Sequence, residues 1–135
     1  MTLESKDKKS LSNIRMARAY EFFEDAKANF KENRYKTAIN RSYYAALSAA
    51  RAILILEGAN PETHEGIVTM LSLRFIKPGI LPVDIIKKFK VLLSRRTDVD
   101  YGDFETVNKA DAEDSIIITE KIIRTMDKAR KKILT

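Results

Sequence analysis

The sequence contains no cysteine, a single histidine (His64), four glycines and three prolines in 135 residues. Without cysteine the chain can form no disulfide, no catalytic thiol and no cysteine-ligated zinc or iron–sulfur site. A single histidine also excludes a multi-histidine metal site within one chain. Because glycine and proline supply most tight turns, their scarcity favours long helices over a turn-rich β fold.

Two kinds of segment are missing as well. The first ten residues, MTLESKDKKS, contain no apolar stretch of the kind found in secretory signals. The longest nearly uncharged run, residues 42–56, contains Arg51 and is too short and too rich in alanine to span a bilayer. We therefore expect a cytoplasmic protein with no membrane partner. The net charge of +6 is compatible with nucleic acid or another acidic partner but requires neither.

What is present is the composition of one soluble, helical domain. Hydrophobic residues make up 44% of the chain and charged residues 33%, in a length typical of a single domain. Apolar residues recur at three- and four-residue intervals, which predicts helices in series after a flexible charged tail over residues 1–10. The expected helices cover residues 12–30, 35–57, 62–76, 82–96 and 109–134. Their short connections predict an all-α, up-and-down antiparallel bundle of about five helices.

Several residues mark the expected helix boundaries. Ser12 or Asn13 can cap the first helix, and Gly58 is a good left-handed terminator for the second. Asn108 with Asp111 three residues later predicts a capping box at the start of the last helix. The fourth helix is expected to bury Val83, Ile86, Phe89, Leu92 and Leu93.

The second expected helix carries a polar stripe on an otherwise alanine-rich surface. Arg41, Tyr44, Ser48 and Arg51 follow one another at offsets of three, seven and ten residues, so they share one helix face. Guanidinium groups match phosphate oxygens, so this stripe is a candidate anion-binding surface. The alternative is that both arginines pair with acids of neighbouring helices.

The stretch SRRTDVDYGDF, residues 94–104, is expected to connect the last two helices. Arg95 and Arg96 close a basic segment, and the helix dipole by itself would favour cations at a helix C-terminus. Four acids then follow within eight residues (Asp98, Asp100, Asp103, Glu105). The acid spacing begins like a calcium loop. However, Gly102 stands at position five and Lys109 at position twelve, so the ligand pattern fails.

His64 begins the third expected helix, in PETHEGI. It is a candidate phosphate contact or acid–base group. The alternative is a capping or packing histidine, because no serine or paired acid stands beside it.

Three segments together resemble the HEPN domain superfamily, in particular its small stand-alone prokaryotic branch. They are NRSYYAALSAARAIL (40–54), THEGI (63–67) and RRTDVDYGDF (95–104), and the resemblance extends over roughly residues 11–134 as one domain. It implies a helical bundle that forms a homodimer, with the arginine motifs of both subunits lining a cleft. Many members are metal-independent ribonucleases, often toxins encoded beside a minimal nucleotidyltransferase.

The resemblance also implies roles for particular residues. In the active branch a histidine follows the motif arginine after four to six intervening residues. No histidine stands at that spacing from Arg95 or Arg96, and Asp100, with four residues between it and Arg95, could occupy the position. Arg96 and Asp100 are thus the candidate catalytic pair, although a carboxylate is a poor base at neutral pH. Tyr101 matches a tyrosine that the nucleotidyltransferase adenylylates in some toxin pairs. The candidate nucleotide- or RNA-binding residues are Arg41, Tyr44, Arg51, His64, Arg95 and Arg96.

Three functions follow as hypotheses. The first is a toxin-like partner of a minimal nucleotidyltransferase that binds nucleotide or RNA phosphate in the dimer cleft. The second is a divergent ribonuclease that uses Arg96, Asp100 and His64. The third is a non-catalytic interaction module whose polar residues are structural. None of the three calls for a metal or another cofactor.

Overall fold

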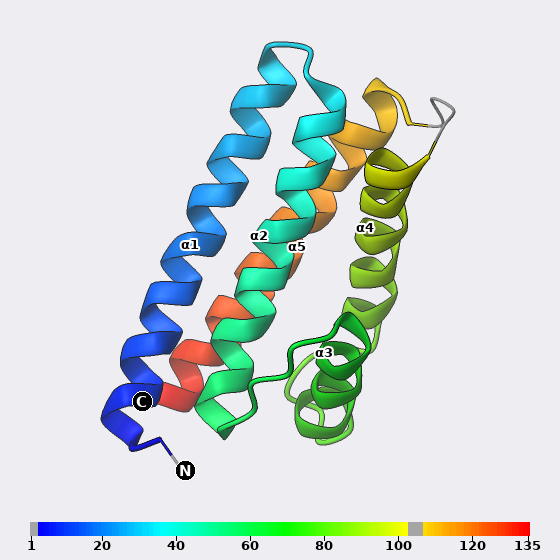
Figure 1. Ribbon diagram of the computed structural model, residues 1–135. Helices are drawn as coiled ribbons and strands as arrows, with labels where there is room; N and C mark the ends of the chain where they lie inside the picture. Colours follow the sequence, from blue (N-terminus) through cyan, green and yellow to red (C-terminus); the bar gives the residue numbers. More distant parts are fainter. Residues whose placement is uncertain (1–2, 103–106) are drawn as a thin grey trace.

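The computed structural model describes residues 3–102 and 107–135, and every regular element in these ranges is helical (Figure 1). The all-α fold class and the helical bundle expected from the sequence are confirmed. The elements are α1 (Ser5–Lys31), α2 (Tyr35–Leu54), the short 3₁₀ turn η1 (Ile55–Glu57), α3 (His64–Leu71), the π-helical turn η2 (Ser72–Ile76), α4 (Asp84–Tyr101) and α5 (Lys109–Leu134).

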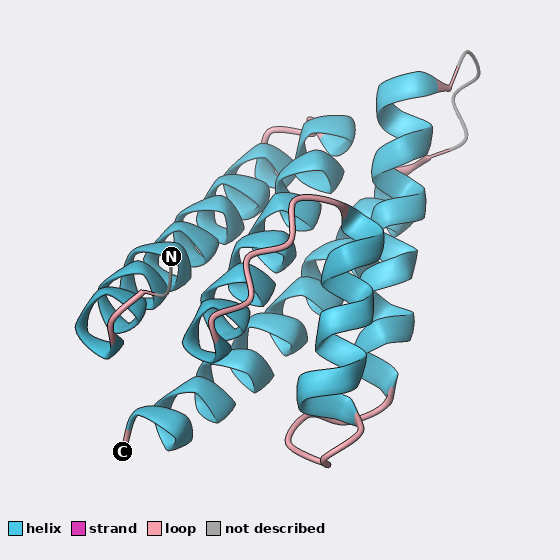
Figure 2. Ribbon diagram, turned by 60° about the horizontal axis from the view of Figure 1, so that its bottom comes forward, coloured by secondary structure: helices cyan, strands magenta, loops and turns pink. Residues whose placement is uncertain are grey.

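The four long helices alternate in direction along the chain. In Figure 1, α1 and α4 run upward and α2 and α5 run downward, so both termini lie at the same end of the bundle. The short pair α3 and η2 lies beside the lower part of α4, as Figure 2 also shows. None of the helices in the described ranges has the length and apolar character needed to cross a membrane.

The core is built around α2. Its alanines at positions 45, 46, 49, 50 and 52 are fully buried, and such small side chains let neighbouring helices approach closely. Tyr43 from α2, Phe75 from η2 and Phe89 from α4 are the largest fully buried side chains and fill the space that the alanines leave. The alanines of α2 are therefore core residues.

The first helix starts earlier than the sequence predicted. It begins at Ser5, and Ser12 is a fully buried residue inside it whose hydroxyl donates to the Ala52 carbonyl at 2.7 Å. The flexible tail expected over residues 1–10 is accordingly wrong for residues 5–10, which are helical. Residues 1 and 2 lie outside the described part of the chain.

The fourth helix ends later than predicted. It continues to Tyr101, so the expected end at residue 96 is wrong and residues 97–101 are helical. Val99 explains the extension, because it packs on a small apolar cluster of Ala38, Ile39 and Ala112. Asp103 and Glu105 lie outside the described residues. Val83, expected in the core, immediately precedes the helix and is 78% exposed.

The other boundary signals are confirmed. Gly58 has φ of 76°, a left-handed conformation that glycine adopts without strain, and follows the last residue of η1. Asn108 and Asp111 exchange both bonds of a capping box at the start of α5.

Candidate functional site

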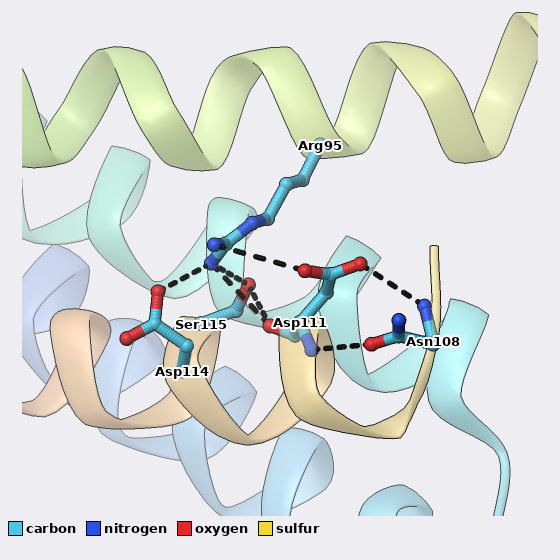
Figure 3. A network of polar contacts seen from close by, with 5 residues as sticks. All are labelled: Arg95, Asn108, Asp111, Asp114 and Ser115. Carbon is cyan, nitrogen blue, oxygen red and sulfur yellow. Dashed lines mark hydrogen bonds and ion pairs between the residues drawn. The ribbon is translucent and has the colours of Figure 1, made fainter. Parts of the chain in front are cut away.

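Arg95 points from α4 toward α5. Its guanidinium lies 2.8 Å from the Asp114 carboxylate, donates to the Ser115 hydroxyl at 3.1 Å and reaches the Asp111 carbonyl at 3.4 Å (Figure 3). Asp111 belongs to the capping box through Asn108, so this network joins α4 to the first turn of α5. Arg95 is therefore occupied in holding two helices together.

Arg96 points the other way, because successive residues of a helix are rotated by about 100°. Its guanidinium donates to the Tyr44 hydroxyl at 3.1 Å, and its Nε lies 2.8 Å from the Asp100 carboxylate one turn further along α4. The guanidinium carbon is 5.6 Å from the ring centres of both Tyr43 and Tyr44. Burial opposes the charge of Arg96, but Tyr44, Asp100 and Tyr101 outweigh that effect and raise its pKa.

His64 reaches the same place from the first turn of α3. The Thr63 side chain caps this turn by accepting from the Gly66 amide at 2.9 Å. A side chain at Gly66 would lie only 2.9 Å from the Thr63 hydroxyl, so glycine permits the tight capped turn. The His64 ring meets the Tyr43 ring edge-on at 5.3 Å between centres, and the Tyr43 hydroxyl bonds its Nδ1.

The protonation of this pair follows from its burial. Burial raises the pKa of Tyr43 to about 12, so the phenol keeps its proton. Burial, then the charges of Arg96 and Arg51, lowers the pKa of His64 below its ordinary value of 6.5. Among the described residues, His64 is the only hydrogen-bonding partner of the Tyr43 hydroxyl, so Tyr43 donates to Nδ1. The neutral imidazole therefore carries its own proton on Nε2.

We call Tyr43, Tyr44, His64, Arg96 and Asp100 the Arg96 site. It combines one partly buried cation, one neutral imidazole donor and two aromatic rings, contributed by α2, α3 and α4. His64 also lines a surface hollow of about 380 Å³ between α3 and α4, with Lys90 on its wall.

The structure places the other predicted residues around this site. Tyr101 is the last residue of α4, is 73% exposed, and its ring lies 5.9 Å from the Arg96 guanidinium carbon. Arg51 is close enough for its charge to lower the pKa of both His64 and Tyr43.

Two predicted residues lie at the margin or away from the site. Arg41 stacks on the Phe22 ring at 5.7 Å, and Phe22 in turn packs on Tyr44 at 6.0 Å. Arg41 thus stands at the edge of the Arg96 site, separated from Arg96 by two rings. Arg95 is not part of the site.

Sequence reasoning missed Tyr43. The residue stands beside the predicted Tyr44 but belongs to the buried side of α2, and its hydroxyl partner His64 lies 21 residues further along the chain. No local pattern connects the two, because the contact depends on how α3 packs against α2.

A family model for the HEPN domain matches residues 12–130. The chain belongs to the HEPN domain family. This HEPN protein is 31% identical over 119 residues to a UPF0332 protein of Thermotoga maritima. The matched region covers 83% of this chain and 90% of the relative. It is 29% identical to a protein of Methanocaldococcus jannaschii named "Putative toxin", over 81% of each chain.

A solved structure shows the same HEPN fold. The crystal structure of a Thermus thermophilus protein superposes with a TM-score of 0.75 at 18% identity, covering 87% of this chain and 97% of the other. At this identity the likeness concerns the arrangement of the helices alone.

Proposed function

We propose that this HEPN protein is the toxin-like half of a two-component module in the cytoplasm, with a minimal nucleotidyltransferase as the other half. In this proposal the protein is a homodimer, and the Arg96 site binds the phosphate of RNA or of a nucleotide. The name of the Methanocaldococcus jannaschii relative supports the toxin-like character. The family resemblance of the arginine motif supports the partner and the dimer.

The observation that carries the proposal is the convergence of His64 and Arg96 on Tyr43 and Tyr44. Arg96 offers charged donors and His64 offers a neutral N–H donor, both suited to phosphate oxygens. The Tyr43 and Tyr44 rings attract the Arg96 guanidinium, so the cation is already in position before a ligand binds. A preorganised cation with a second donor nearby therefore supports the binding of a phosphate at this site.

The same geometry argues against efficient RNA cleavage. Removal of the 2′-hydroxyl proton needs an available base. The Asp100 carboxylate is held by Arg96 at 2.8 Å and by Asn40 at 3.5 Å. His64 already uses Nδ1 to accept from Tyr43 and carries a proton on Nε2. Binding is therefore the better supported function.

A divergent metal-independent ribonuclease is the second candidate, and one observation favours it. His64 is absent from the arginine motif, yet it lies in the same site as Arg96 with a pKa below 6.5. A change of tautomer would free Nε2 as a base. The interaction module remains the third candidate, because the Arg96 side chain is only 16% exposed.

Binding and cleavage can be separated with two forms of one RNA. We expect the wild type to bind a 2′-O-methyl oligonucleotide, which cannot be cleaved, and Arg96→Gln to weaken binding by about tenfold, the effect of a single lost contact of ~1.4 kcal/mol. Arg124→Gln, an exposed arginine on α5, is the matched control. Equal binding by wild type and Arg96→Gln would leave only the interaction module. Cleavage of unmodified RNA by wild type but not by His64→Gln would establish the ribonuclease.

Tyr101 is the proposed site of modification by the nucleotidyltransferase. Its exposed phenol oxygen would bond to the α-phosphorus of ATP, pyrophosphate would leave, and the phenol proton would pass to water. Co-expression should add the mass of one AMP group to the wild type and none to Tyr101→Phe. Peptide mapping distinguishes Tyr101 from Tyr20, whose hydroxyl is bonded to Asp127. An unmodified wild type contradicts this part of the proposal.

A further inference from the structure

We propose that Arg15, Arg18 and Arg51 form a second phosphate position, the Arg51 cluster, beside the Arg96 site. This inference rests on the proposed function. It adds that the ligand is a single-stranded RNA whose phosphates continue from the Arg96 site along the seam between α1 and α2. A mononucleotide would occupy only the first position.

The cluster is built by two antiparallel helices. Arg15 and Arg18 stand one turn apart on α1, and Arg51 lies in the last turn of α2. The Arg15 guanidinium donates to the Arg51 carbonyl at 3.4 Å, which ties the two helices together at this point. Arg18 stands one turn further along α1 than Arg15, so the three arginines share one end of the seam. The charges of Arg51 and Arg18 both act on Arg15.

The charge of the cluster is not balanced by acids. Within residues 3–102 and 107–135, Arg34, Arg95, Arg96, Arg124 and Arg130 each form an ion pair. Within the same ranges the three arginines of the cluster form none, and neither do Arg41 and Arg74, which stand apart from each other on α2 and η2. The Nε of Arg51 is buried and has no hydrogen-bonding partner among the described residues. The Nε of Arg96 is likewise buried without a hydrogen bond to any of them, but it has the Asp100 carboxylate as an ion-pair partner at 2.8 Å. Burial, followed by the charges of Arg51 and Arg18, lowers the pKa of Arg15.

Such an arrangement is unfavourable without an anion. Like charges close together repel, and a buried donor without an acceptor loses its hydration. The bond from Arg15 to the end of α2 uses one of its five guanidinium donors. This bond does not account for the presence of Arg18 and Arg51 beside Arg15. A bound phosphate would supply acceptors to all three groups and relieve the repulsion.

The cluster and the Arg96 site are parts of one surface. Arg51 lies two turns beyond Tyr44 on the same face of α2, and the charges of Arg51 and Arg96 both act to lower the pKa of His64. Along α2, Arg51 is seven residues beyond Tyr44, which corresponds to roughly 10 Å. A stacked strand advances by roughly 3.4 Å per phosphate, so this length accommodates about three phosphates.

The residue types favour RNA over an acidic protein. All three cations are arginines, whose planar forks match phosphate in two-point contacts. Tyr101 offers a largely exposed ring beside Arg96, on which an unpaired base can stack. A carboxylate-rich protein surface would use the arginines but would not need the ring.

The test compares ligand lengths on matched charge variants. The double variant Arg15→Gln/Arg18→Gln removes two cations from the cluster, and Arg74→Gln/Arg124→Gln removes two exposed arginines from η2 and α5. The probes are AMP and a 2′-O-methyl oligonucleotide of about eight residues, within the usual range of single-strand sites. Affinity is measured by titration over a salt series, and urea midpoints establish that each variant is folded.

We expect the cluster variant to weaken oligonucleotide binding about tenfold or more and to leave AMP binding unchanged. Its salt dependence should fall by about 0.7 in slope for each lost phosphate contact, while the control pair stays near wild type. If the first double variant does not fold, Arg18→Gln alone, at an exposed position, replaces it.

The failures are distinguishable. A wild type that binds neither probe overturns the proposed function itself. Oligonucleotide binding that Arg96→Gln weakens but the cluster variant does not overturns the second phosphate position alone. Loss of binding to the purified nucleotidyltransferase, with RNA binding intact, overturns RNA as the occupant and assigns the cluster to an acidic protein surface.

Discussion

The two nitrogens of His64 have different surroundings, and this difference decides what the residue can do. Nδ1 accepts from a phenol that is fully buried and keeps its proton, whereas Nε2 carries the proton of the neutral ring. Arg96 and Arg51 both disfavour a further proton. At this scale His64 is a neutral donor held in one tautomer, which suits a phosphate oxygen better than a hydroxyl to be deprotonated.

The titration of His64 tests this description directly, since it is the only histidine and its NMR signals need no assignment. We expect a midpoint below 6.5, and a higher midpoint in Arg96→Gln because one positive charge is removed. Arg124→Gln should leave the midpoint unchanged. A wild-type midpoint at or above 6.5 would contradict the assignment.

The same shift has a consequence for stability. Because the pKa of His64 is lower in the folded protein than its ordinary 6.5, the unfolded chain takes up the proton first as the pH falls. The contribution of neutral His64 is therefore complete above 6.5 and is lost as the pH falls through 6.5 toward the folded pKa. Urea unfolding on both sides of this window should show a smaller loss for His64→Gln than for the wild type.

Tyr43→Phe isolates the hydroxyl from the ring. The ring packs on Phe89 at 5.7 Å and stays in the core, so we expect a loss of only about 1 kcal/mol in the free energy of unfolding. The ¹⁵N shifts of His64 should change from the Nε2–H tautomer to a mixture. Tyr20→Phe removes a comparable hydroxyl bond, to Asp127, and should leave the tautomer unchanged. An unaltered tautomer in Tyr43→Phe would count against the donor role of Tyr43.

At the scale of the helices, α4 carries two neighbouring arginines with separate tasks. Arg95→Gln breaks the bonds to Asp114 and Ser115 and should lower the free energy of unfolding by about 1–3 kcal/mol, with RNA binding retained. Arg96→Gln makes the same change of charge but should mainly weaken binding. Urea unfolding and RNA titration of both variants check the division. Equal losses of binding would show that general charge, and not the Arg96 site, attracts the RNA.

The boundaries of these helices show what the sequence could and could not supply. Gly58 and the Asn108 capping box were predictable because their bonds are made within a few residues. Ser12 resembles a cap in sequence, yet its partner Ala52 is 40 residues away, so nothing local marks it as buried. The acids after Arg96 suggested a loop, but the packing of Val99 overrides their low helix propensity.

The candidate site was predictable in its residue types and only partly in its membership. The resemblance identified Arg96, Asp100, Tyr101 and His64, and the structure brings them together. It could not say which of two adjacent arginines faces α2, because that depends on the rotation of α4. Arg15 and Arg18 escaped notice because their only connection to Arg51 is the packing of α1 on α2.

At the scale of the whole molecule, the proposed function requires two copies. We expect sedimentation equilibrium at micromolar concentration to give twice the 15.4 kDa of one chain, because the resemblance implies a cleft lined by both subunits. The Arg95→Gln variant is the control that separates loss of the dimer from altered folding. Its changed contact, between α4 and α5, lies within one chain. A mass of 15.4 kDa for a protein that still binds RNA would remove the dimer from the proposal.

The attachment of Arg96 to both Tyr44 and Asp100 has a further consequence for the end of α4. Helix ends open locally at small free-energy cost, and here Arg96 fastens the last turn to α2 through its own side chain. An anion that joins Arg96 and leaves Asp100 in place should slow amide hydrogen exchange in residues 97–101. One that displaces Asp100 should quicken it. Ligand occupancy and local opening of this turn are thus linked equilibria, and the sign of the change in exchange reports how the anion is held.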